Sequence, residues 1–472
     1  MLQLLILFLV PLVWSQKHAP YGSKTPYHLV AGNVLDFDFP CKPVSLFSVH
    51  RHGTRNIGKN IVKRIDTLVG ALQSTYKTKG LPNDNLKWLL DFSHGNKPNK
   101  DLIVEGYRQL SGQGERFSQV FPDLLSDTSH VRVGTSFKGR CISSALSFLH
   151  GAYGKSFRVS NESEILKTKD IRRDCEGMCH VYEPVVEMKS ERDRKSDRPH
   201  ITFEHQQNHL LRYYKECRNY VTKEGNKAAW QAAPNKYLTG SRMTRLTKKM
   251  GERLGIQLSP HDVVTLHILC ALEVGVPRLM SNSQFCSLFE ENELYVTAFY
   301  LDLMRYNGKM IPEAVNSSCV LMQDGLNFLK QDRGANLKFA HTETIFPLLE
   351  HMGHLTEPMS AKRSLLEREF YGDITPLGSN FFMVAMKCPD SSERIVQTFL
   401  NEKPIEFPNC GSPCKLDKIL EMFPEEGCDF VGVCEGRGFD LYSCLTVEMA
   451  VLSIMVVVVI EFIRRCFLLV RW

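Results

Sequence analysis

Residues 44–57 read VSLFSVHRHGTRNI, a mostly apolar run that we predict to be a buried strand, followed by a basic, glycine-containing loop. In this loop His52 can attack phosphorus, because an imidazole is largely neutral near pH 7. Arg51 and Arg55 flank it with permanently charged forks that match phosphate oxygens, and Gly53 lets the backbone approach an anion. Open α/β folds bind ligands at the carboxyl ends of their strands, so this position favours a phosphate site over a basic surface loop.

A second stretch of the chain carries the other groups that a phosphohistidine mechanism needs. Residues 337–340 read as a short strand, and residues 345–352 have helical spacing with a glycine after them as a stop signal. His341 and Glu343 therefore lie at another strand-to-helix junction. There the imidazole would grip phosphate and the carboxyl would protonate the leaving oxygen. The alternative for Glu343 is a capping carboxylate at the start of the helix.

Arg140 is a third candidate phosphate ligand. It follows a strand-like run at 130–133 and precedes the Ser144-Ala145 step by four residues. The dipole of a helix does not favour a cation at its start, so a bound anion would account for this arginine. The alternative is a solvated surface arginine.

These motifs resemble those of the histidine acid phosphatases, whose signature is Arg-His-Gly-x-Arg-x-Pro; Ile57 stands where that family usually has proline. Residues 339–349 are similar to the multiple inositol polyphosphate phosphatase branch, in which His-Ala-Glu-Thr precedes Leu-Leu-Pro-Leu-Leu. Thr342 replaces the alanine. Residues 23–27, Ser-Lys-Thr-Pro-Tyr, precede the signature as they do in that branch, and the likeness spans about residues 20–435.

The resemblance implies a role for each matched residue. His52 would be the nucleophile and Glu343 the proton donor, while Arg51, Arg55, Arg140 and His341 would bind phosphate. Lys24, Thr54 and Thr342 are candidates for substrate contact. Two disulfides, Cys41 with Cys388 and Cys270 with Cys286, are also implied, and no metal or other cofactor is expected.

The order of strand-like and helical stretches predicts one α/β domain, split in sequence between residues 28–150 and 260–400. The resemblance implies that this domain is of the histidine-phosphatase type. Residues 151–259 are polar and helix-like, and we expect them to form an inserted α-helical cap. Residues 405–444 are expected to form a cysteine-rich stalk. The pairing of its cysteines stays open, and a zinc site is the alternative to disulfides there. The stalk cysteines are Cys410, Cys414, Cys428, Cys434 and Cys444.

Both ends of the chain indicate the secretory route. Residues 1–15 read as a signal peptide, and the fifteen cysteines suit an oxidising compartment. Asn161 and Asn316 begin glycosylation sequons. The apolar stretch 445–463 predicts membrane attachment, either as a span followed by two arginines or as a lipid-anchor signal. The catalytic domain would then be lumenal or extracellular, in the endoplasmic reticulum or at the cell surface.

The net charge of +6 is modest for 472 residues and does not imply nucleic-acid binding. The basic stretch 167–198 is mixed with acidic residues, so it is either a solvated face or an electrostatic funnel for a polyanion.

The expected activity is a metal-independent phosphomonoesterase that removes phosphates from inositol polyphosphates, such as inositol hexakisphosphate, through a phosphohistidine. The resemblance also implies 2,3-bisphosphoglycerate as a substrate. Two alternatives stay open: a broad-specificity acid phosphatase of the lysosomal type, and a membrane protein that binds inositol phosphates with little turnover.

Overall fold

A computed structural model of the protein describes residues 20–93, 100–154, 157–159, 200–204, 207–276, 279, 282–309, 311–355 and 371–435. Several features expected from the sequence lie outside these residues: the signal peptide, Asn161, the basic stretch 167–198, Cys444 and the apolar stretch 445–463.

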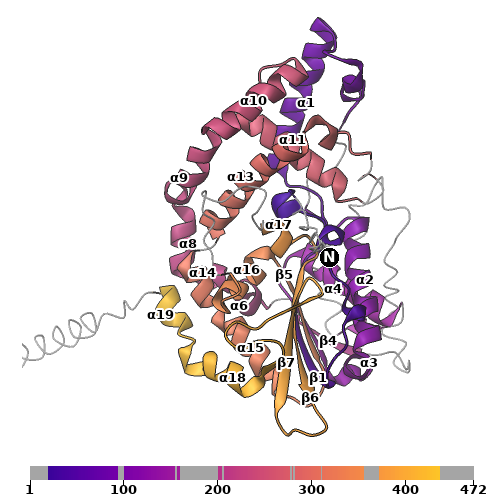
Figure 1. Cartoon of the computed structure of the whole chain (residues 1–472), viewed down its shortest axis with the longest axis vertical. Helices are drawn as coiled ribbons and strands as arrows, with labels where there is room; N and C mark the ends of the chain where they lie inside the picture. The colour runs from indigo at the N-terminus through magenta and orange to yellow at the C-terminus, as the bar shows by residue number, and fades with distance from the viewer. Residues whose placement is uncertain are drawn as a thin grey trace, which may run out of the picture.

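The core of the protein is a mixed sheet in the order β3-β4-β2-β5-β1-β6-β7-β8, with β9 pairing with β7 (Figure 1). From β3 to β1 the neighbours are parallel, whereas β6, β7, β8 and β9 join as antiparallel strands. The strands are β1 Lys42–Arg51, β2 Val131–Thr135, β3 Arg158–Val159, β4 His200–Glu204, β5 Ala335–Ala340, β6 Asn380–Lys387, β7 Arg394–Leu400, β8 Lys403–Ile405 and β9 Cys414–Lys415.

Helices cover both faces of this sheet. The described α-helices are α1 Lys59–Lys79, α2 Val104–Val120, α3 Pro122–Leu125, α4 Gly139–Tyr153, α6 Asn208–Leu211, α7 Tyr213–Glu216, α8 Arg218–Gly225, α9 Lys227–Leu238, α10 Ser241–Leu254, α11 Pro260–Val274, α13 Glu291–Lys309, α14 Pro312–Ser317, α15 Cys319–Leu329, α16 Thr342–His351, α17 Tyr371–Ile374, α18 Leu416–Met422 and α19 Phe430–Glu435. Short 3-10 helices include η1 Gly22–Lys24 and η4 Asp84–Leu90.

The alternation of side chains along β1 explains the two-sided packing. Leu46 joins the apolar cluster formed with α2, α3 and α4 on one face. Phe47 and Val49 join the cluster formed with α15 and α16 on the other face. Because both faces are covered, the strand is apolar on both sides, as is typical of parallel sheets.

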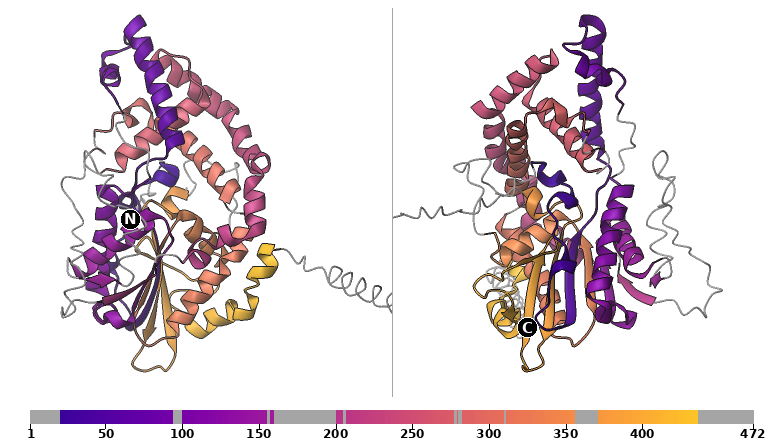
Figure 2. Two further views of the ribbon diagram at one scale, coloured as in Figure 1. Left: turned by 180° about the vertical axis from the view of Figure 1, so that it is seen from behind. Right: turned by 45° about the vertical axis from the view of Figure 1, so that its right-hand side comes forward.

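A second group of helices, labelled α1, α9, α10, α11 and α13, lies at one end of the molecule, away from the strands (Figure 1). The two further views show the same separation (Figure 2). Apolar side chains of α1, η4, α10, α11 and α13 share one hydrophobic cluster. The helical cap is therefore not the expected insertion at 151–259 alone. Helices α1, α11 and α13, which lie outside that range, also bury apolar side chains in it. Residues 200–204 instead form a strand of the main sheet.

The expected stalk is wrong for the described residues up to 435. Strand β9 pairs with β7, and Leu416, Ile419 and Cys434 are buried in the main core with α15 and α16. Disulfides Cys217–Cys434 and Cys319–Cys428 tie this region to the helices. The pairs Cys41–Cys388 and Cys270–Cys286 are both bonded, as expected, and Cys410 bonds to Cys414. Among the described helices, none is both long enough and apolar enough to cross a membrane.

Candidate active site

Strands β1 and β5 are parallel neighbours, and predicted site residues lie at or just beyond their carboxyl ends. Arg51 in β1 is paired with Ala340 in β5, and the backbone N–H of His52 donates to the carbonyl of Ala340 at 3.1 Å. The rings of His52 and His341, the residues just beyond these two strands, lie 5.7 Å apart between centroids. The two stretches that the sequence places almost 300 residues apart therefore meet at one edge of the sheet.

The loop after β1 is held against α2 and α4. A side chain at Gly53 would place its Cβ 2.5 Å from the carbonyl oxygen of Gly106, so the two backbones touch. The N–H of Gly53 donates to Ser144 Oγ at 3.1 Å. The N–H and hydroxyl of Thr54 both donate to Gln109 Oε1 at 3.0 Å. Both donor groups of Thr54 therefore serve to hold the loop in place.

His52 is buried and oriented for attack through one ring nitrogen. Its Nδ1 lies 3.0 Å from the carbonyl oxygen of Gly53. A carbonyl only accepts, so Nδ1 carries the proton and the lone pair is on Nε2. Burial, followed by the positive charge of Arg140, holds the pKa of His52 well below its usual 6.5. The imidazole is therefore neutral and nucleophilic near pH 7.

Cations crowd around this histidine. The Nη2 of Arg51 donates to the carbonyl of Ser23 at 3.0 Å, which brings η1 into the site. Burial and the charge of Arg305 lower the pKa of Arg51 to about 9, and burial and Arg140 lower the pKa of Arg55 to about 10. Both arginines stay protonated near neutral pH. Burial is the larger cause for both arginines, and the neighbouring positive charges add to it; a bound anion would offset that repulsion.

Lys24 belongs to the same cluster, because burial and then the charges of Arg55 and Arg51 hold its pKa well below 10.5. The third substrate-contact candidate, Thr342, is turned toward Thr375, and the two hydroxyls lie 2.6 Å apart. The structure therefore brings Lys24 toward Arg51 and Arg55, while the hydroxyls of Thr54 and Thr342 already have protein partners.

The neighbours of His341 keep its imidazole neutral and select one tautomer. The Nη2 of Arg140 lies 3.2 Å from Nδ1, and a guanidinium only donates, so Nδ1 accepts and Nε2 carries the proton. Nε2 then donates to Ser136 Oγ at 3.1 Å. Burial, then Arg140, holds the pKa of His341 well below 6.5. The buried thiol of Cys141, which forms no disulfide, lies 3.7 Å from Nε2.

Glu343 lies in the first turn of α16, where the sequence placed it. Its Oε1 accepts from Arg305 Nη1 of α13 at 2.8 Å. Sequence reasoning missed Arg305 and Ser136. Neither belongs to a motif with a spacing of its own, and both reach the site only through folding.

Two further cations, Lys138 and Arg212, lie next to the cluster of cations around His52. The ring of Phe137 is 39% exposed, with Lys138 Nζ 3.8 Å and Arg212 Cζ 4.9 Å from its centroid. Arg212 acts on the pKa of His341, and Arg140 acts on that of Lys138. Lys138 and Arg212 thus extend the positive region outward from His52.

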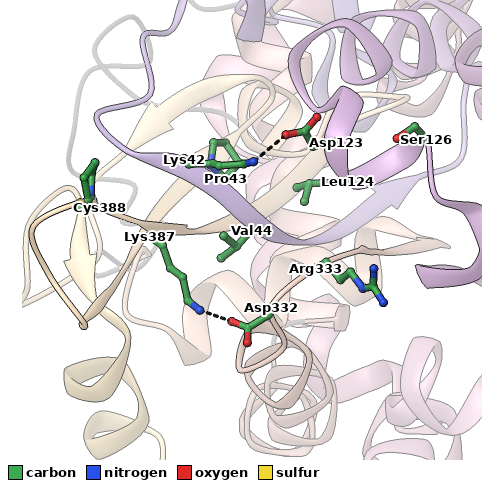
Figure 3. A pocket seen from close by; sticks show the side chains of 11 residues that line it. Lys42, Pro43, Val44, Asp123, Leu124, Ser126, Asp332, Arg333, Lys387 and Cys388 are labelled. Carbon is green, nitrogen blue, oxygen red and sulfur yellow. Dashed lines mark ion pairs between the residues drawn. The ribbon is translucent and has the colours of Figure 1, made fainter.

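A groove of about 620 Å³ lies elsewhere, at the start of β1 (Figure 3). Its lysines are paired with carboxylates: Lys42 Nζ lies 3.1 Å from Asp123, and Lys387 Nζ lies 2.5 Å from Asp332. Their charges are balanced, so this groove offers an anion far less than the site at the other end of the strand.

Comparison with known proteins agrees with this geometry. Residues 45–401 match the Histidine phosphatase superfamily (branch 2). Multiple inositol polyphosphate phosphatase 1 of Homo sapiens is 24% identical over 436 residues, which cover 82% of each chain. The Drosophila melanogaster protein of the same name is 23% identical and covers 89% of this chain and 91% of its own.

Solved structures share the fold. The phytase from D. castellii has a TM-score of 0.65 at 18% identity and covers 88% of this chain and 87% of its own. A Bifidobacterium longum multiple inositol polyphosphate phosphatase, in complex with inositol hexasulfate, has a TM-score of 0.63 at 16% identity and covers 86% of this chain and 98% of its own. The predicted family, enzyme class and α/β fold are confirmed. The chain belongs to branch 2 of the histidine phosphatase superfamily.

Proposed function

We propose that the protein is a phosphomonoesterase that removes phosphates from inositol polyphosphates through a phosphohistidine on His52. One observation carries this proposal: a neutral, buried imidazole with its free lone pair on Nε2 lies among Arg51, Arg55 and Arg140, and the carboxyl of Glu343 borders the same cluster.

In the first step Nε2 of His52 forms a bond to phosphorus while the bond from phosphorus to the ester oxygen breaks. Glu343, in its acid form, gives its proton to the leaving oxygen. Arg51, Arg55 and Arg140 stabilise the charge on the other phosphoryl oxygens. In the second step Glu343 takes a proton from water, the water oxygen bonds to phosphorus, and the bond from Nε2 to phosphorus breaks. Phosphate leaves, and the neutral imidazole returns.

The positive charges of Lys138 and Arg212, which lie outside the cluster around His52, favour a substrate with several phosphates. Lys138 and Arg212 add positive charge beyond that of the arginines that would hold the first phosphate. Inositol hexakisphosphate could place its remaining phosphates against them. The names of the relatives point to the same substrate class. 2,3-Bisphosphoglycerate is a smaller substrate that the same charges would accept, and a broad acid phosphatase is the second candidate function.

The test is phosphate release from inositol hexakisphosphate and from an aryl phosphate by the purified protein and its variants. We expect His52→Ala to lose activity on the order of a thousandfold or more, because the group that would carry the phosphoryl is removed. Glu343→Gln should slow the inositol ester most, since its leaving oxygen needs the proton.

Three results would contradict the proposal. Full activity of His52→Ala would exclude the phosphohistidine. A preference for the aryl phosphate would favour the broad acid phosphatase. Tight binding of inositol hexakisphosphate by the unmodified protein without phosphate release would favour a binding protein.

We also propose that the enzyme works in the secretory pathway, attached to a membrane through residues 445–463. Five disulfides among the described residues are typical of an oxidising compartment. Asn316, the described sequon residue, is exposed on α14. Glycosidase treatment and detergent extraction of the natural protein would test the two parts of this proposal.

A further inference from the structure

We propose that Arg305 holds the Glu343 carboxylate in the free enzyme and passes to the scissile phosphate when substrate binds, which leaves Glu343 to take up the proton for the leaving group. This inference rests on the proposed function and adds to it a residue from the helical cap.

The ion pair joins two separate parts of the fold. Arg305 lies on α13 of the cap, and Glu343 lies in the first turn of α16, directly after β5. The two side chains meet at 2.8 Å, and they are 28% and 23% exposed. A pair with this exposure is open to exchange with a ligand, unlike one sealed in a core.

The surrounding charges place Arg305 within the proposed phosphate site. Its charge contributes to the lowered pKa of Lys24, Arg51 and Arg55. A phosphate bound by Arg51 and Arg55 therefore also attracts Arg305, and it repels the carboxylate of Glu343. Both effects favour the exchange of partners.

Glu343 has further charged or titratable neighbours that bear on its protonation. They come from β1 and its loop, from the residue before α16, and from α7 and α8: Arg51, Arg55, His341, Tyr214, Lys215 and Tyr220. Arg305 makes a direct ion pair with this carboxylate, at 2.8 Å.

The proton balance follows from the exchange. When Arg305 leaves Glu343 for the phosphate, the carboxylate takes a proton from solvent and later gives it to the ester oxygen. During hydrolysis of the phosphohistidine, Glu343 accepts a proton from the attacking water. When phosphate departs, Arg305 returns and that proton goes back to solvent. The sum is ester plus water to alcohol plus phosphate.

The experiment compares Arg305→Met and Arg305→Lys with Arg253→Met. Arg253, on α10, is a matched control. Its side chain is also 28% exposed, and it pairs at 2.9 Å with Glu293, which lies on α13 as Arg305 does. The pH dependence of kcat/KM with inositol hexakisphosphate is measured for all three and for the unmodified enzyme.

For Arg305→Met we expect a loss in kcat/KM of roughly 10- to 100-fold, because a charged hydrogen bond is removed. The basic limb of its pH profile should move to higher pH by about one unit, because the Glu343 carboxylate stays protonated to a higher pH once its cation is removed. Arg305→Lys, which keeps the charge, should restore the position of the limb. Arg253→Met should leave it unmoved.

Other results would overturn the inference. If the basic limb of Arg305→Met stays in place, or Arg253→Met moves it equally, Arg305 does not act through Glu343. If Arg305→Lys moves the limb as far as Arg305→Met, the cation is not the cause. These results would leave the proposed function intact if the unmodified enzyme is active and His52→Ala is not. If the unmodified protein releases no phosphate from inositol hexakisphosphate, both proposals are wrong.

Discussion

At the scale of single residues, two buried histidines in one stretch have different neighbours. His50 points into the core, where its Nδ1 lies 3.0 Å from Gln113 Oε1 and its ring stacks on Phe339. Burial lowers the pKa of His50 to about 4. His52, two residues later, is past the end of β1 and lies among Arg51, Arg55 and Arg140. The same residue type thus serves packing at one position and, in the proposed function, phosphoryl transfer at the other.

The buried state of His52 predicts how activity depends on pH. Because burial holds the pKa of His52 well below 6.5, the imidazole stays neutral as the pH falls through 6.5, and its protonation should not limit attack there. We expect kcat/KM to show no acid limb near pH 6.5, and any limb due to this residue to lie lower. A pH profile of kcat/KM reports the free enzyme and measures this directly. An acid limb centred near 6.5 in this enzyme would contradict the prediction.

At the scale of elements, helix α2 positions the signature loop by close contact of backbones. A Cβ on Gly106 would lie 2.1 Å from the carbonyl oxygen of Thr54, a contact that neither backbone can relieve without moving. Gly70 in α1 is exposed and has nothing within 4 Å of the same position. The two helical glycines therefore make a matched pair.

We expect Gly106→Ala to destabilise the protein by about 1–3 kcal/mol through overpacking, despite the higher helix propensity of alanine, and to lower kcat/KM at least about tenfold because the loop moves. Gly70→Ala should instead stabilise it by up to about 1 kcal/mol, since only propensity changes. Urea unfolding and kcat/KM measure both effects. Normal stability and activity of Gly106→Ala would show that the loop does not depend on this contact.

At the scale of the whole molecule, disulfides connect parts of the fold that are distant in sequence. Cys217, just before α8, is bonded to Cys434 in α19, across a separation of 217 residues. Cys410 and Cys414 close a separation of only 4. A crosslink that closes a longer loop restricts the unfolded chain more.

Replacing Cys217 and Cys434 together by alanine should therefore lower the free energy of unfolding by about 2–4 kcal/mol. The matched double replacement of Cys410 and Cys414 should cost less. Chemical denaturation of both variants under oxidising conditions makes the comparison. An equal or larger loss for the short loop would mean that local packing, rather than chain entropy, sets the contribution.

The sequence predicted the elements around the site closely, because strand and helix signals there are strong. Strand β5 covers 335–340 where 337–340 was expected, and α16 begins at Thr342. The extent of the cap was predicted poorly: α1 follows the signature directly, yet its apolar side chains pack with α10 and α11. Helical periodicity shows that a helix has an apolar face, and it does not show which distant helix covers that face.

Local patterns and residue types were enough to predict the family, the strand-end position of His52 and His341, and most of the groups gathered around them. Folding was needed to show that Arg305 of the cap pairs with Glu343, that Cys217 bonds to Cys434, and that residues up to 435 belong to the body. Contacts of this kind join residues far apart in the chain, and their geometry is set by the packing of whole elements rather than by any local signal.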